Sequence, residues 1–97
     1  MRSQVYSYVY FMANANNSTL YIGVTSDLLK RVWEHNNGVD HSSFTYRYNC
    51  NKLVYYEVFG DIKYAIAREK QLKNWNRAWK NKLVEKDNPE WIELSIT

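Results

Sequence analysis

The sequence predicts an α+β fold, in which a small three-stranded antiparallel sheet is flanked by helices in the order β-β-α-β-α-α. Three runs rich in Tyr, Val, Leu and Ile predict the strands, at residues 4–12, 20–25 and 53–59. The segments after the second and third runs carry apolar residues at spacings of three and four, which is typical of amphipathic helices. Only a short polar turn separates the first two runs, so they are expected to form an antiparallel hairpin.

The first strand is predicted to run from Gln4 to Met12, with much of both faces covered, because a single serine interrupts its apolar residues. Polar residues 14–19 form the turn, and the second strand follows at residues 20–25. Gly23 lies inside this second strand. A glycine there marks a bulge or a close approach of another group to the backbone, or simply the end of the strand.

The first helix is expected to carry Asp27 in its first turn, to be capped by Thr25 or Ser26, and to stop at residues 36–38. Residues 39–52 have no clear period and are predicted to be a loop that could lie over a site. A loop in that place would bring polar and aromatic side chains next to the first helix.

Two pairs of residues on the first helix are four positions apart, and the members of each pair share a face. Arg31 and His35 form one pair. Lys30 and Glu34 form the other, and they can make an ordinary ion pair on the surface.

The second half of the chain predicts two more helices, from Ile62 to about Trp75 with Asp61 as cap, and from Arg77 to Lys86, before a last short turn. The apolar stripe of the earlier helix contains a carboxylate: it comprises Ile62, Ala65, Ile66, Glu69 and Leu72. An ionised glutamate buried without a partner is costly, so Glu69 either reaches solvent or meets a cation. The inward residues expected of the later helix are Trp79, Leu83 and Val84.

The composition describes one small domain comprising residues 1–97. The chain has 13 basic and 10 acidic side chains, a net charge of +3, and an aromatic fraction of 16%. Large aromatic side chains can supply the core that a chain of this length needs. Basic and aromatic residues are interleaved, and that mixture suits a nucleic acid or another polyanion as partner.

A single cysteine, Cys50, excludes a disulfide framework and a Cys-rich zinc site, and it favours a reducing compartment. We expect Cys50 to be a passive residue. The uncharged stretch at residues 3–26 has polar residues in its middle and cannot span a bilayer. The chain is therefore predicted to be cytoplasmic, with no membrane partner.

Most standard catalytic motifs are absent, including the Walker loop, G-x-G-x-x-G, H-E-x-x-H and G-x-S-x-G. Four short motifs remain: Tyr8-Val9-Tyr10, Tyr21-Ile22-Gly23-Val24-Thr25, Leu28-x-x-Arg31-x-x-x-His35 and Ala65-x-x-x-Glu69. In this order, over roughly residues 5–95, the chain resembles the GIY-YIG nuclease superfamily, and more narrowly its small single-domain bacterial branch. Tyr8 and Val9 stand where the family's first motif has Gly and Ile.

The resemblance implies an active site of five residues. Glu69 matches the family's metal ligand, and one carboxylate with water and substrate phosphate is an acceptable shell for Mg²⁺ or Mn²⁺. Arg31 matches the arginine that holds phosphate oxygens. Tyr21 matches the general base or water-orienting group, Tyr10 supports it, and His35 serves as a proton relay to Tyr21 or a phosphate contact. From the residues alone, each of these side chains could instead have a structural role, and for Glu69 and Arg31 the residues alone favour that role.

On this resemblance we expect a metal-dependent GIY-YIG endonuclease that hydrolyses phosphodiester bonds in DNA, structure-selectively or nonspecifically, in DNA repair or recombination. Tyr46 and Tyr48 could stack on bases, and His41 matches no motif. The expected nucleic-acid contacts are Lys30, Arg47, Lys52, Arg68, Lys73 and Arg77.

Two alternatives stay open. One is a catalytically weak or inactive nucleic-acid-binding module of the same fold. The other is a protein-interaction domain whose contact surface is formed by Trp75, Trp79 and Trp91. RNA as substrate and a protein partner are left open, and a monomer is the expected state.

Overall fold

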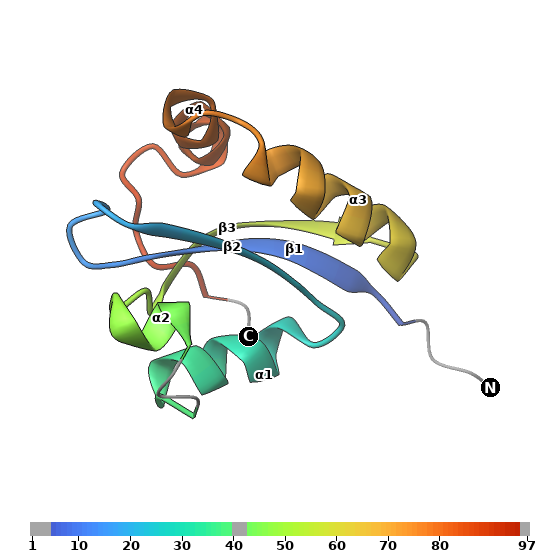
Figure 1. Cartoon of the computed structure of the whole chain (residues 1–97), viewed down its shortest axis with the longest axis horizontal. Helices are drawn as coiled ribbons and strands as arrows, with labels where there is room; N and C mark the ends of the chain where they lie inside the picture. The colour runs from blue at the N-terminus through green and yellow to red at the C-terminus, as the bar shows by residue number, and fades with distance from the viewer. Residues whose placement is uncertain (1–4, 40–42, 96–97) are drawn as a thin grey trace.

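The computed structural model describes residues 5–39 and 43–95, and it contains one three-stranded antiparallel sheet with strand order β2-β1-β3 (Figure 1). The strands are β1 (Ser7–Ala13), β2 (Leu20–Thr25) and β3 (Lys52–Phe59). The central strand β1 therefore pairs on both sides, while β2 and β3 are edge strands. The predicted fold class is confirmed.

Helices cover both faces of the sheet (Figure 1). On one face lie α1 (Leu28–Asn36) and α2 (Phe44–Arg47), and on the other lie α3 (Ile62–Lys73) and α4 (Arg77–Asp87). The short helix α2 was not predicted, because a single turn has no hydrophobic period to detect. Asp27, rather than Thr25 or Ser26, is the N-cap of α1, since its carboxylate accepts a hydrogen bond from the backbone N–H of Lys30 at 3.1 Å.

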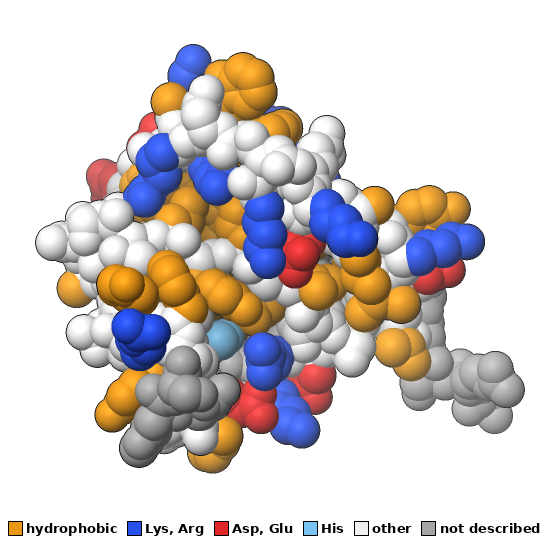
Figure 2. All heavy atoms as spheres, viewed as in Figure 1, with side chains coloured by type: hydrophobic (Ala, Val, Ile, Leu, Met, Phe, Trp, Pro, Cys, Tyr) orange, Lys and Arg blue, Asp and Glu red, His pale blue; other side chains and the backbone are white. Residues whose placement is uncertain are grey.

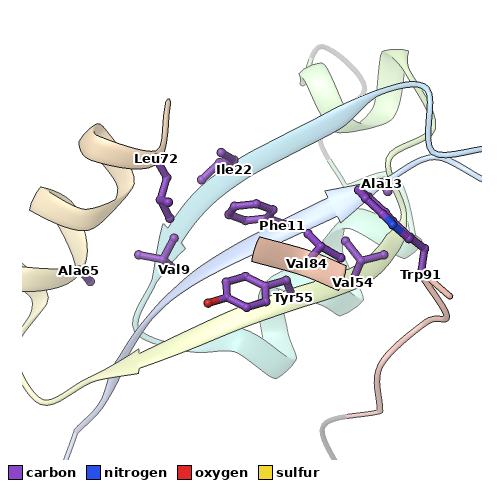
Figure 3. Close-up of a cluster of buried hydrophobic side chains, with 10 residues drawn as sticks. All are labelled: Val9, Phe11, Ala13, Ile22, Val54, Tyr55, Ala65, Leu72, Val84 and Trp91. Carbon is purple, nitrogen blue, oxygen red and sulfur yellow. The ribbon is translucent and has the colours of Figure 1, made fainter. Parts of the chain in front are cut away.

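Alternate residues of β1 form two separate cores, as the period of a strand requires. Val9, Phe11 and Ala13 pack under α3 and α4, together with Leu72 and Val84 of those helices (Figure 3). On the opposite face, under α1, lies the cluster Tyr10, Met12, Leu28, Cys50 and Leu53. The expectation that β1 is covered on both faces is confirmed.

The buried face of α3 is narrower than the apolar stripe in the sequence predicts. Ala65 and Leu72 are fully buried, whereas Ile62 and Ile66 are 44% and 38% exposed. Three strands are too few to cover the flanks of a helix, so only its central line is buried. For the same reason Trp79 of α4 is 55% exposed rather than inward, while Val84 is buried.

An ion pair holds α3 to β3. The Arg68 guanidinium donates to both carboxylate oxygens of Glu57, at 2.9 and 3.0 Å, and the Tyr55 hydroxyl donates to the same carboxylate. Burial works against ionisation of Glu57, but these hydrogen bonds hold its pKa below the ordinary value. A bidentate arginine pair of this kind fixes the helix orientation as well as its position.

Gly23 is opposite Tyr10 in the antiparallel register of β1 and β2, and the tyrosine ring lies directly over it. A Cβ at position 23 would lie 2.5 Å from the Tyr10 hydroxyl oxygen and 2.6 Å from the ring carbon that bears it. The close approach that the sequence allowed for Gly23 is therefore the one observed. Tyr10 is fully buried and cannot move aside without disturbing its neighbours.

Gly23→Ala should lower the free energy of unfolding by about 1–3 kcal/mol, because the added methyl group overpacks the Tyr10 ring. Gly60→Ala is the matched control, since nothing lies within 4 Å of the Cβ it would add. Urea denaturation of both variants measures the difference. Equal stability of the two variants would contradict the packing described for Gly23.

Candidate active site

Tyr10 projects from the central strand toward α1, where its hydroxyl meets the imidazole of His35. The Tyr10 hydroxyl oxygen lies 3.1 Å from His35 Nε2, and His35 Nδ1 lies 2.7 Å from the Thr45 hydroxyl oxygen of α2. Thr45 is itself buried, and its hydroxyl lies 3.2 Å from that of Ser43. Both ring nitrogens of His35 thus have partners, and these fix the plane of the ring.

Tyr21 completes a cluster of three rings at the β2 edge of the sheet. Its ring centroid lies 6.1 Å from that of Tyr10 and 5.8 Å from that of His35. Tyr21 is half-buried, so it forms the boundary between the buried Tyr10 and solvent. His35 was expected to relay protons to Tyr21, but the hydrogen bond that it makes within this cluster is to Tyr10.

Arg31 lies one helical turn before His35, and both line the same hollow together with Thr45. The guanidinium of Arg31 is 3.3 Å from the Glu34 carboxylate. Glu34 is therefore paired with Arg31 rather than with Lys30, the partner that the sequence also allowed. The spacings of three and four both permit an ion pair, and Glu34 makes it with Arg31.

The surroundings keep Tyr10 and His35 uncharged at neutral pH. Burial and the neighbouring Tyr21 raise the pKa of Tyr10 to about 12, against the opposing effect of Arg31. Burial and the Arg31 charge also lower the pKa of His35 below its usual value, against the opposing effect of Glu34. A protonated phenol beside a neutral imidazole is an arrangement that can pass a proton.

Glu69 lies on α3, on the opposite face of the sheet from α1. Its carboxylate is half-buried and lies 3.5 Å from Lys73 Nζ, so it meets a cation, one of the two outcomes expected for it. Lys73 in turn lines a hollow of about 260 Å³ with Tyr21, Phe44 and Lys80. The Glu69–Lys73 pair thus adjoins the ring cluster at the β2 edge.

Glu69 is the single carboxylate among the five residues expected in the site, so a divalent ion held there would keep most of its water. Within the described residues, no three His, Cys, Asp or Glu side chains gather in a group that could hold a metal. A single carboxylate completed by water and substrate phosphate is a typical Mg²⁺ shell, and Glu69 can supply it. Lys73 competes for the same oxygen.

A model of the GIY-YIG catalytic domain matches residues 6–83. The chain belongs to the GIY-YIG family. The recognition made from the four motifs is thereby confirmed, and the catalytic domain of this family is of nuclease type.

Relatives of similar length support the assignment. The chain is 37% identical over 84 residues to a UPF0213 protein of Syntrophus aciditrophicus, covering 87% of this chain and 94% of the relative. It is 35% identical over 80 residues to a UPF0213 protein of Haloquadratum walsbyi, covering 82% and 88%. The solution NMR structure of a UPF0213 protein from Bacillus halodurans superposes with a TM-score of 0.57 at 25% identity, covering 95% of this chain and 99% of that one.

The six basic residues predicted to contact nucleic acid fall into two groups. The first group donates hydrogen bonds within the fold. Arg68 donates to Glu57, and Arg77 donates to the backbone oxygens of Asn17 and Ser18. Lys52 donates to the Asn17 side chain at 2.7 Å. The second group comprises the exposed Lys30, Arg47 and Lys73. Figure 2 shows Lys and Arg side chains above and below a hydrophobic band on one face. Of the three exposed residues, Lys73 pairs with Glu69 on its own helix.

Two residues of this site were missed by sequence reasoning. Thr45 and Phe44 belong to α2, in the segment predicted as a loop, and no motif in the sequence distinguishes them. His41 lies outside the described residues. Cys50 is buried, and burial raises the pKa of its thiol, which agrees with a passive role.

The three tryptophans proposed as a contact surface do not share one environment. Trp91 is buried and donates to Glu85 at 2.9 Å. Trp75 packs partly against the core, and only Trp79 is largely exposed. In the described part of the chain, none of the helices is long and apolar enough to cross a membrane.

Arg31→Gln should raise the pKa of His35, because it removes a positive charge that disfavours the imidazolium. Glu34→Gln should lower the pKa of His35 below its wild-type value, because it removes a negative charge that favours the imidazolium. The other groups that face the ring are Tyr10, Tyr21 and Thr45. NMR titration of the His35 ring protons measures both shifts.

Lys30→Gln is the control, since it removes the same charge from an exposed position on α1. Equal shifts in the Arg31 and Lys30 variants would show that Arg31 has no specific contact with the ring cluster.

Proposed function

We propose that the protein is a metal-dependent endonuclease that hydrolyses phosphodiester bonds in DNA, structure-selectively or nonspecifically, with a role in DNA repair or recombination. The observation that carries the proposal is the convergence of Tyr10, Tyr21, Arg31 and His35 from β1, β2 and α1 at one edge of the sheet. These are the motif residues of a nuclease-type family, and the fold brings them within contact of one another.

Hydrolysis requires an aligned water, a proton acceptor and positive charge at the phosphoryl oxygens. Tyr21 is half-buried at the edge strand, where it can orient the attacking water. As the water attacks phosphorus, its proton passes to the Tyr21 hydroxyl oxygen, the Tyr21 proton passes to Tyr10, and the Tyr10 proton moves to Nε2 of the neutral His35. The bond from phosphorus to the leaving oxygen breaks at the same time, and that oxygen takes a proton from solvent. The ring proton on Nδ1 is then shared with Thr45.

Arg31 supplies the positive charge on the side of α1. Its guanidinium can hold two phosphate oxygens at once, and in the free protein it is paired with Glu34 at the surface. This ion pair is only partly buried and is therefore weak, so a phosphate can replace the carboxylate at little cost.

Glu69 would hold the Mg²⁺ or Mn²⁺ ion in this proposal. When bound, such an ion supplies positive charge against the phosphoryl and leaving oxygens. Lys73 can then turn from Glu69 toward a substrate phosphate, because its side chain is half-exposed and long enough to move.

One observation favours the alternative of a catalytically weak binding module. The Glu69 carboxylate is paired with Lys73, and this pairing opposes metal binding. A chain in which the pair never opens would bind DNA through its exposed cations and cut it poorly. DNA binding in either case should weaken steeply with salt.

Glu69→Ala and Arg31→Ala should each reduce cleavage by on the order of 100-fold or more, since each removes charge stabilisation in the transition state. The assay uses labelled branched, single-stranded and duplex DNA with Mg²⁺ or Mn²⁺, and with chelator as the metal-free control. Glu90→Ala and Lys63→Ala are matched controls at exposed positions and should cleave like the wild type.

No cleavage of any DNA by the wild type, together with salt-dependent binding that survives Glu69→Ala, would overturn the nuclease proposal in favour of the binding module. Products that both active-site variants still make would overturn the assignment of these residues.

A further inference from the structure

A row of three aromatic rings leads from the ring cluster onto α2. Tyr21 stacks on Phe44 with ring centroids 5.9 Å apart, and the ring centroids of Phe44 and Tyr48 are 4.6 Å apart. Phe44 and Tyr48 are 44% and 47% exposed, although large aromatic side chains gain stability from burial. This aromatic row, Tyr21–Phe44–Tyr48, begins at a residue of the proposed active site and ends at the surface.

Cations flank the aromatic row. Tyr21 and Phe44 line a hollow whose other wall carries Lys73 and Lys80 of α3 and α4. At the far end, the Arg47 guanidinium lies 5.9 Å from the Tyr48 ring centroid. Figure 2 shows a hydrophobic band on one face of the molecule, with Lys and Arg side chains above and below it.

A ligand that fits this surface combines flat apolar rings with negative charge at regular intervals. A single-stranded nucleic acid has both features, because its bases can stack on protein rings while its phosphates contact lysine and arginine. Duplex DNA does not fit equally well, since each paired base is already stacked on its neighbours and offers only its edges.

We propose that the aromatic row is a stacking site for unpaired nucleobases, with Lys73 and Lys80 holding the phosphates beside them. This inference rests on the proposed nuclease function, and it names the substrate class of the same site. A strand that lies along the row brings its phosphate backbone to Tyr21, where Lys73 lines the same hollow. The enzyme would therefore cut DNA in or beside unpaired segments.

The test measures binding by Glu69→Gln, which is not expected to cut, to two oligonucleotides of equal length. One is single-stranded and carries the fluorescent base 2-aminopurine, and the other is the fully paired duplex. Two variants, Phe44→Leu and Tyr48→Leu, are each made in the Glu69→Gln background. Each should weaken single-strand binding by about tenfold and abolish the quenching of 2-aminopurine fluorescence. The affinity for the duplex should change by less than about twofold. Phe44→Trp should retain both binding and quenching.

Tyr64→Leu is the matched control, because Tyr64 is also an exposed ring with a lysine against it, Lys63, 5.2 Å away. Equal losses for single strand and duplex, no loss in either ring variant, or a loss as large in the control would overturn the stacking site.

Different results would refute the nuclease function and the stacking site. Single-strand binding that depends on Phe44, with no cleavage by the wild type, removes the nuclease function and keeps the stacking site. Metal-dependent cleavage by the wild type that is unchanged by Phe44→Leu on single strands removes the stacking site and keeps the nuclease.

Discussion

The contact of the Tyr10 ring with the bare backbone of Gly23 is the constraint on which the candidate site depends. Tyr10 belongs to the central strand and is fully buried, and its hydroxyl reaches His35 only because no Cβ stands at position 23. His35 is then oriented by Tyr10 on one side and by Thr45 on the other. The bare backbone at position 23 thus leaves room for the ring that contacts His35.

The narrow sheet explains why residues from both of its faces can act together. With only three strands, the edge strand β2 is next to the central strand, and α3 packs against both. Arg31 and His35 come from the helical layer under the sheet, whereas Glu69 and Lys73 come from the layer above it (Figure 1). Tyr21 on β2 lies between these two layers, and the proposed substrate surface follows that edge.

Local chemistry made much of the fold predictable. Strand β2 and the start of α3 agree with the sequence because a run of β-branched and aromatic residues and an Asp cap are local signals. The short α2 has no such signal, and its Thr45 becomes important only through a contact with His35, ten residues earlier. The sequence also could not show which arginines have partners within the fold, because these partners are distant in sequence. Arg68 donates to Glu57, and Arg77 donates to the β1–β2 turn. The sequence motifs contain Tyr10, Tyr21 and His35, and the topology brings these three rings together.

The central claim, that Gly23 is required because Tyr10 lies over it, is tested most directly by a double-mutant cycle. The cost in unfolding free energy of Gly23→Ala is measured in the wild-type background and in Tyr10→Leu, where no ring crosses the backbone. The account predicts that the cost of about 1–3 kcal/mol falls to near zero in the Tyr10→Leu background. An equal cost in both backgrounds would contradict it, because Gly23 would then be needed for a reason other than Tyr10.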